Sequence, residues 1–268
     1  MRISRSERMM NYVVLVLFAA FAAAPMLTIL ATAFSARIGE TGAFHPENFV
    51  EAWRVGNFAD SFVNSILVAV LVVLSALVLS ALSGYAFATM RFPGSTGLFY
   101  LFMLGLMIPS EAVVIPLFFD LRSIGLVDTL AAVTLPQVAQ SVAFGTFWMR
   151  GQFRAMPTSL LEAAALDGAG PLRALTRILV PASRPSLVTL AVLLLVWTWN
   201  EFLIVLVMTP GGSLRTAPLG LANFQGQYTA ETALLSAAAV IVMLPMLVVF
   251  LFLNRQVIAG MLEGAARD

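Results

Sequence analysis

The chain has 268 residues, of which 60% are hydrophobic and 11% charged, and its formal net charge is +1. A soluble protein of this size cannot bury so much apolar surface, and disordered chains are poor in hydrophobic residues, so both classes are excluded. The composition predicts an all-α, polytopic membrane protein whose outer surface is solvated by lipid.

Six apolar stretches are long enough to cross a bilayer, which takes about 20 helical residues. They lie near 12–34, 62–89, 97–119, 128–149, 184–209 and 234–254. Strands are much shorter than these stretches, so the spans are expected to be helices. The first stretch follows three arginines, as a signal peptide would, but it continues to Phe34. This is too long for the core of a typical signal peptide, and we interpret the stretch as a retained span.

Arginine counts predict the orientation of the six spans. If both termini are inside, 11 arginines lie in inner segments and four in outer segments. The inner ones are Arg2, Arg5, Arg8, Arg91, Arg150, Arg154, Arg173, Arg177, Arg184, Arg255 and Arg267, and the outer ones are Arg37, Arg54, Arg122 and Arg215. Basic residues collect on the cytoplasmic side of membrane proteins, so both termini are expected in the cytoplasm.

The third stretch contains a carboxylate, Glu111, between Pro109 and Pro116. An ionised side chain at membrane depth normally faces protein or water. Proline interrupts a helix, so Glu111 is expected near the N-terminus of a second half-helix, where negative charge is favoured. The alternative is that Glu111 lines a polar pathway through the membrane.

The inner loop at roughly 150–183 is the most polar part of the chain and is expected to form two short helices. Ser159 and Glu162 have the spacing of a capping box at the start of the first helix. Alanines and Leu166 favour that helix, and Asp167-Gly168 is a typical end for one. Pro171 suits the first turn of a second helix, which should run from Leu172 to Val180. The loop could equally be a surface hairpin that only joins two spans.

The fifth stretch carries a polar group of residues near its outer half. Trp197, Asn200 and Glu201 follow an inner entry near Ser186 by up to about 15 residues, or about 22 Å of helix. An amide, a carboxylate and indoles could line a polar path through the membrane. The alternative is a hydrogen bond to a neighbouring helix or a place at the outer interface.

Several motifs resemble one family. Glu162-Ala163-Ala164-x-x-Asp167-Gly168-Ala169, followed by Ile178-Leu179-Val180-Pro181, resembles the EAA loop of bacterial ABC importer permeases. Further matches are Asn64-Ser65, Gly84-Tyr85-Ala86-Phe87-Ala88, Arg91-Phe92-Pro93-Gly94, Met107-Ile108-Pro109, Ile115-Pro116 and Trp199-Asn200-Glu201-Phe202. Together they resemble the maltose-type carbohydrate permeases, specifically the six-span partner of the pair. One departure is the C-terminal tail, where Gly264-Ala265 is kept but Ala266 or Arg267 replaces the family's lysine.

The resemblance implies a type I ABC importer permease fold in the bacterial cytoplasmic membrane, with 1–268 as a single permease domain whose core is roughly 60–255. The chain would not be an enzyme and would bind no cofactor. Its partners would be a second permease of similar fold, an ATPase dimer that uses ATP and magnesium, and an extracytoplasmic sugar-binding protein. The implied ATPase-coupling residues are Ser159, Glu162, Ala163, Ala164, Asp167, Gly168 and Ala169, and the candidates for the translocation pathway are Trp197, Asn200, Glu201 and Glu111. The third outer loop, with residues 223–228, could reach the binding protein or be an ordinary connector.

Absent residue types limit other functions. There is no cysteine or lysine, which excludes disulfide frameworks, thiolate zinc sites, Schiff-base chemistry and the lysine of a P-loop. An intramembrane enzyme is disfavoured, because the motifs H-E-x-x-H and G-x-S-x-G are missing and the single histidine, His45, is expected to be solvated in an outer loop. A stand-alone carrier or channel for a small polar solute stays open, with Glu111 and Glu201 as its only coupling candidates.

Overall fold

The computed structural model describes residues 5–37, 42, 44–212, 214–224 and 231–265, and all regular elements among them are helical. The longer helices are α1 (Arg5–Ala33), α3 (Phe58–Thr89), α6 (Leu130–Arg154), α10 (Arg184–Trp199) and α13 (Thr232–Ala265). The shorter ones are α2 (Glu47–Val55), α4 (Ser95–Met107), α5 (Ser110–Ser123), α7 (Ser159–Leu166), α8 (Pro171–Ala174), η1 (Leu175–Leu179), α9 (Val180–Ala182), α11 (Leu203–Met208), α12 (Ala217–Gly220) and η2 (Leu221–Phe224). The predicted all-α class is confirmed.

Four described helices, α1, α3, α6 and α13, are each long and apolar enough to cross a membrane, and two bent helix pairs raise the number to as many as six. The third predicted span is one of the bent pairs, because α4 and α5 meet at 99°. The break lies at Ile108 and Pro109, where the backbone is extended. The prolines therefore predicted this interruption correctly.

The fifth predicted span is not one continuous helix, which corrects the prediction for 184–209. An 80° bend precedes α10, and α10 ends at Trp199, before α11 begins at Leu203. At the break, the amide of Asn200 turns back and donates to Val196 O at 2.8 Å. The flanking residues are as apolar as a span requires, so hydropathy alone could not detect the interruption.

The chain forms two compact units, and the smaller one comprises 1–59 and 220–245. It contains Asn48, a fully buried residue whose side-chain amide donates to Ala33 O at 3.0 Å and Ser35 O at 2.9 Å. These bonds tie α2 to the end of α1. His45 is not solvated as predicted, because its side chain is 12% exposed and its Nδ1 lies 2.7 Å from Glu47 Oε1.

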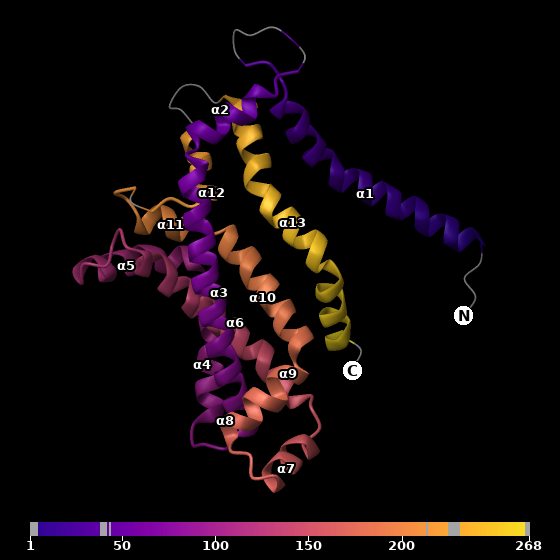
Figure 1. Ribbon diagram of the computed structural model, residues 1–268, viewed down its shortest axis with the longest axis vertical. Coiled ribbons are helices and arrows are strands. Elements are labelled where there is room, and N and C mark those ends of the chain that lie inside the picture. The colour runs from indigo at the N-terminus through magenta and orange to yellow at the C-terminus, as the bar shows by residue number, and fades with distance from the viewer. Residues whose placement is uncertain (1–4, 38–41, 43, 213, 225–230, 266–268) are drawn as a thin grey trace. The chain divides into compact units, whose positions relative to one another are not determined.

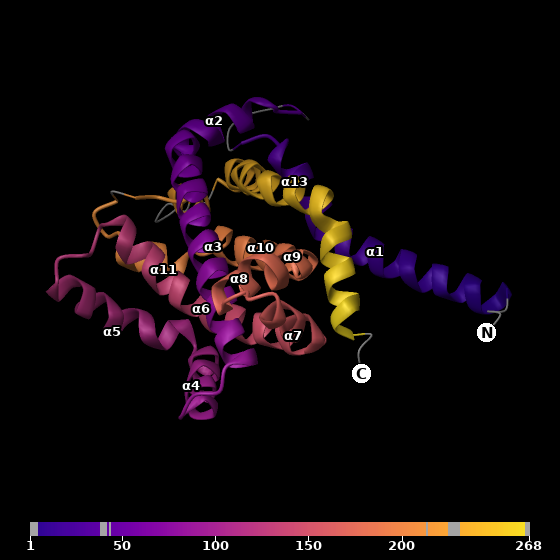
Figure 2. The same cartoon turned by 60° about the horizontal axis from the view of Figure 1, so that its bottom comes forward.

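The larger unit comprises 60–219 and 246–268. Figures 1 and 2 show α3, α6 and α10 running alongside one another, with α5 leaving this bundle at the bend after α4. One apolar cluster joins α3, α5, α6 and α11 around Val72, Val133 and Met208. A second cluster joins α3, α6 and α10 to the 150–183 loop around Met149, Leu179 and Leu190. Each end of the bundle therefore has its own core.

Helices α3 and α6 pack closely through small residues. A Cβ on Gly84 would lie 2.7 Å from Met149 Cβ and 3.0 Å from the backbone nitrogen of Arg150. One turn away, the hydroxyls of Ser83 and Thr146 are 2.6 Å apart. Small side chains let helices in a membrane approach closely enough for dispersion and hydrogen bonds to hold them together. The Gly84 contact fixes the register of α6 against α3.

We expect the Gly84→Ala variant to lower the thermal unfolding midpoint of the purified protein in detergent. The added methyl group meets backbone and Cβ atoms that cannot turn aside, and such overpacking costs about 1–3 kcal/mol. Gly105→Ala in α4 is the matched control, because a Cβ there has nothing within 4 Å. Equal unfolding midpoints for the two variants would contradict the close approach of α3 and α6.

Candidate functional site

The first helix of the 150–183 loop is α7, and its N-terminus differs from the prediction. Thr158 is the N-cap, and the structure shows no side-chain hydrogen bond there. The proposed capping box of Ser159 and Glu162 is therefore wrong. Thr158 already has helical backbone angles, and its carbonyl accepts from the nitrogens of Leu161 at 2.9 Å and Glu162 at 3.0 Å. Backbone carbonyls thus satisfy amides that the serine side chain was expected to bind.

The C-terminus of α7 agrees with the prediction. Gly168 has φ +72°, a left-handed conformation that glycine adopts without the steric cost of a Cβ. Gly168 N donates to Ala165 O at 3.0 Å, and Ala169 N donates to Ala164 O at 2.9 Å. This pair of bonds is the Schellman motif, which satisfies the last carbonyls of a helix. The predicted Asp167-Gly168 helix end is confirmed.

The second helix of the loop contains a wider turn that the sequence analysis did not predict. It begins at Pro171 as expected, but residues 175–179 form a π-helix before α9 continues to Ala182. Pro181 has no amide to donate to the carbonyl of Arg177, which disfavours the regular α-helical register here. The segment then bends by 80° into α10. Proline spacing could have indicated this irregularity.

Buried side chains fasten the loop to the helical bundle. Leu175 and Leu179 are almost fully buried in the cluster that contains Met149 and Phe153 of α6. The ring of Phe153 meets Tyr85 of α3 edge-on at 6.4 Å. A displacement of η1 would therefore shift the packed side chains of α3 and α6, because close-packed interiors transmit strain.

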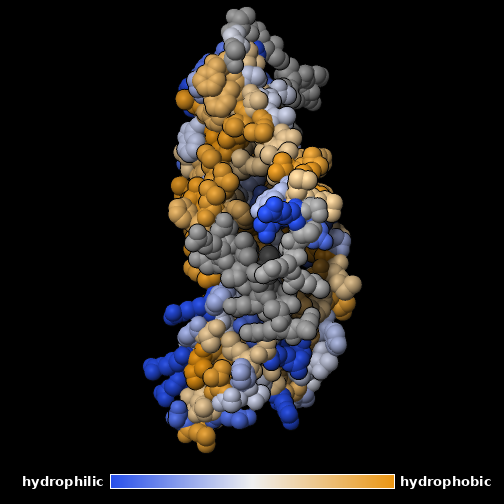
Figure 3. Space-filling model, turned by 90° about the vertical axis from the view of Figure 1, so that its right-hand side faces the viewer, coloured by the Kyte–Doolittle hydropathy of each residue, from blue (hydrophilic) through white to orange (hydrophobic). Residues whose placement is uncertain are grey.

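The outward side of α7 is apolar and small, with charges beside it. Ala164 faces inward and is buried, whereas Glu162, Ala163 and Asp167 are exposed. Leu166 is 90% exposed. Figure 3 shows hydrophilic and apolar atoms side by side at the lower end, where Figure 1 places α7. Such a surface suits a protein partner that covers apolar atoms and meets charges at its edge.

The two carboxylates of the interrupted spans both lie at helix starts. Glu111 is in the first turn of α5, as predicted, and lies on the surface of the chain. Glu201 is half-buried, and its Oε1 accepts from the backbone nitrogen of Ile204 at 2.8 Å. Glu201 therefore caps α11, an arrangement that the sequence analysis considered only for Glu111. Within the described residues, neither carboxylate forms an ion pair.

The remaining pathway candidates lie on one face of α10. Trp197 is half-exposed and its ring lies 4.8 Å from that of Phe144. Asn200 is exposed and follows by three residues, which places both side chains on the same side of the helix. Trp199 faces the other way, is buried and meets Phe62 edge-on at 5.8 Å. The structure therefore groups Trp197 with Asn200.

Long-range hydrogen bonds hold the start of α12 and the residues just before it against α3. Ser65 Oγ accepts from Ala217 N at 2.8 Å, and Asn64 Nδ2 donates to Arg215 O at 3.1 Å. Asp128, with φ +63°, holds the other end of the same connection by accepting from Gly211 N at 2.9 Å. Asn64-Ser65 was identified from the sequence only as a family match, and no role was predicted for Asp128. An aspartate tolerates the left-handed conformation better than most residues, but only the fold shows its partner.

Parts of two predicted features lie outside the described residues. In the third outer loop these are residues 213 and 225–230, and the predicted contact of that loop with a binding protein stays a prediction. In the C-terminal tail, Ala266 and Arg267 are outside as well.

Comparisons with known proteins agree on one family. Residues 76–262 match the family described as binding-protein-dependent transport system inner membrane component. The trehalose transport system permease protein SugB of Mycobacterium tuberculosis is 34% identical over 223 residues, which are 82% of this chain and 81% of that protein. The arabinooligosaccharides transport system permease protein AraQ of Halalkalibacterium halodurans is 32% identical over 262 residues, or 93% of each chain.

A solved structure shows that the fold is shared with such transporters. A chain of a bacterial ABC transporter involved in the import of the acidic polysaccharide alginate superposes with a TM-score of 0.76 and 22% sequence identity. The superposition covers 95% of this chain and 99% of the other.

The capping role of Glu201 predicts different effects for two substitutions. Glu201→Ala removes the acceptor for Ile204 N, which should cost about 1 kcal/mol of stability, as the loss of a helix cap does. Glu201→Gln keeps an acceptor oxygen and should unfold at the wild-type temperature. The thermal unfolding midpoints of the two purified variants in detergent, compared with that of the wild type, test both expectations.

Transport by the Glu201→Gln variant then separates capping from a pathway role. Uptake near the wild-type level would assign Glu201 to the cap alone. A changed substrate affinity in a variant of normal stability would show that the charge itself acts in the pathway.

Proposed function

The chain belongs to the family of inner membrane components of binding-protein-dependent transport systems, and we propose that it forms half of the translocation pathway of an ATP-driven sugar importer. The family and the helical fold predicted from the sequence are thereby confirmed. A second permease of similar fold would complete the pathway. Both termini would lie in the cytoplasm of a bacterial cell, where the positive-inside rule puts the arginine-rich segments.

The observation that carries the proposal is that α7 is exposed while the loop behind it is anchored by a base of buried side chains, Leu175 and Leu179. The family match includes the whole of α7 and its base. Ala163 and Leu166 face outward from a helix whose other side is packed, so a partner can approach without displacing any part of this chain. We assign α7 and the Gly168 turn as the contact with an ATPase subunit. The sequence has no P-loop of its own, so ATP and magnesium would be used entirely by that partner.

Alternating access would use the mechanical link between α7 and the bundle. When ATP closes the two ATPase subunits, α7 would move with the subunit that holds it. The buried side chains of Leu175 and Leu179 would pass this displacement to α3 and α6. Two interrupted helices, at Pro109 and at Asn200, would let half-spans turn without unfolding whole helices. The sugar moves because the outward and inward states bind it differently.

We propose that the sugar contacts the exposed pair Trp197 and Asn200 at the end of α10. Trp197 offers an indole ring and Asn200 an amide, which suit the apolar face and the hydroxyls of a saccharide respectively. The named relatives transport trehalose and arabinooligosaccharides. A stand-alone carrier is less well supported, because Glu201 uses its carboxylate to cap a helix. We therefore propose an oligosaccharide delivered by an extracytoplasmic binding protein.

Purification of the tagged chain from its native membrane in a gentle detergent tests the assembly. Mass spectrometry should identify an ATPase, a second permease and a sugar-binding protein in the same preparation. A stable, folded chain recovered alone would contradict the proposal and favour a carrier or channel.

The coupling role of α7 predicts that Gly168→Asp separates assembly from transport. A Cβ on Gly168 meets nothing within 4 Å, so the new carboxylate would project toward the partner surface. We expect uptake of the sugar to fall by about tenfold, within the range of coupling energies between sites, while the protein still inserts in the membrane.

Gly125→Asp is the matched control for Gly168→Asp. Gly125 also has φ +72° and nothing within 4 Å of a Cβ, and it ends α5 rather than α7. Both variants therefore carry the same backbone strain and the same charge. Equal uptake by the two variants would show that the Gly168 turn has no special role in coupling.

A further inference from the structure

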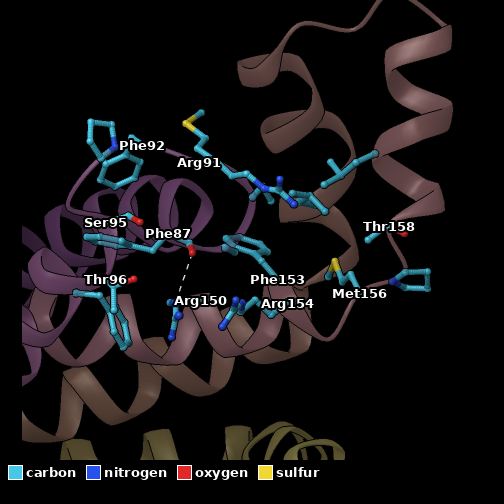
Figure 4. Close-up of a pocket in the computed structure, with 18 residues that line it drawn as sticks. Phe87, Arg91, Phe92, Ser95, Thr96, Arg150, Phe153, Arg154, Met156 and Thr158 are labelled. Carbon is cyan, nitrogen blue, oxygen red and sulfur yellow. Dashed lines mark hydrogen bonds between the residues drawn. The ribbon is translucent and has the colours of Figure 1, made fainter.

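A cleft of about 770 Å³ opens between the α3–α4 connection and the end of α6. Its lining comes from residues 87–99, from the last turn of α6 with the residues that follow it, and from Leu161 and Leu179 of the 150–183 loop. Figure 4 shows Arg91 entering from the connection after α3, and Arg150 and Arg154 entering from α6. The transport mechanism described above uses none of these three arginines.

The cleft concentrates positive charge without a matching negative charge. No aspartate or glutamate lines it, and within the described residues no carboxylate forms an ion pair with Arg91, Arg150 or Arg154. Arg150 and Arg154 are four residues apart on α6, where like charges repel each other. An anion in the cleft would relieve that repulsion.

One of the three arginines is held in position by the protein. The guanidinium of Arg150 lies 3.9 Å from the ring centroid of Phe99, and its Nε donates to Phe87 O at 3.4 Å. This bond uses one of the five N–H groups of an arginine side chain. The hydroxyls of Ser95 and Thr96, in the first turn of α4, line the same cleft. The site therefore combines a fixed cation, two exposed cations and neutral donors, a set that suits a phosphate group.

The apolar part of the cleft indicates what carries the phosphate. Phe92, Phe153 and Met156 line it beside the arginines. From its rim, α4 continues with Leu98, Leu101 and Leu104, which are exposed and three residues apart, so they lie along one side of the helix. A small inorganic anion would use none of this surface, whereas an amphiphile would use all of it.

We propose that this cleft binds the phosphodiester headgroup of an anionic phospholipid, with its acyl chains along the exposed leucines of α4. Basic pockets between helices at a membrane surface are suited to such headgroups. The bound lipid would also touch the base of α7, because Thr158 and Leu161 line the same cleft. The lipid would then help to hold the loop against the bundle, a role that does not depend on which solute is transported.

Retention of phosphatidylglycerol by the purified transporter tests the proposal. The full chain, in its native assembly, is placed in nanodiscs of phosphatidylcholine with a minor fraction of phosphatidylglycerol that carries a photoreactive acyl chain. After irradiation, mass spectrometry locates the attached lipid on the peptides of the chain. We expect labelling of α4 and the cleft residues. We expect the Arg91→Gln/Arg154→Gln variant to label about 30-fold less, because each arginine contributes about 1 kcal/mol and a tenfold change corresponds to about 1.4 kcal/mol. Arg150 is left intact because it also packs on Phe99.

The matched control is Arg173→Gln/Arg177→Gln, which removes two exposed arginines from the same loop region but not from the cleft. This variant should label like the wild type. Equal labelling of the two double variants, or labelling only elsewhere on the chain, would overturn the proposal. Inorganic phosphate and glycerol 3-phosphate are added as competitors in a separate arm. If either abolishes labelling at millimolar concentration, the site takes a free phosphate rather than a lipid.

Discussion

The contact between α3 and α6 at Gly84 determines the positions of most other features in the larger unit. Because glycine has no side chain, the backbone of α3 reaches Met149 and Arg150 directly. Met149 is fully buried in the apolar cluster that holds the 150–183 loop, and Arg150 is directed into the cleft beside Phe99. The surface of α7 and the charge of the cleft thus both depend on the register of one helix pair.

Local sequence signals predicted the elements whose cause is local. The apolar stretches gave the positions of α1, α3, α6 and α13, and Pro109 gave the break between α4 and α5. The end of α7 at Gly168 was also predictable, because few residues other than glycine adopt its backbone conformation. The start of α7 was not, since Ser159 and Glu162 fit a capping box but the carbonyls of Pro157 and Thr158 satisfy the amides first.

Features that depend on distant partners could not be read from the sequence. The carboxylate of Glu201 looked like a pathway group, and its capping role follows only from the interruption of the fifth span. Trp197 and Trp199 are the same residue type two positions apart, so the sequence does not distinguish them. In the structure Trp197 is half-exposed, whereas Trp199 is buried against Phe62. The cleft combines residues 87–99 with 150–161, which no spacing rule connects. Features that arise within one helix could be predicted from the sequence, whereas features built from residues of several helices could not.

The hydrogen bonds that join Asn64 to Arg215 and Ser65 to Ala217 have a consequence for biosynthesis. Their partners lie 151 and 152 residues later in the chain. At about 5–20 residues per second, a ribosome needs about 8–30 s to make the intervening segment. During that interval, α3 is in the membrane while the groups that will bind its second turn do not yet exist. Asn64 and Ser65 must meanwhile be hydrated at the membrane surface, so this end of the protein can reach its final form only after three further helical segments have been inserted.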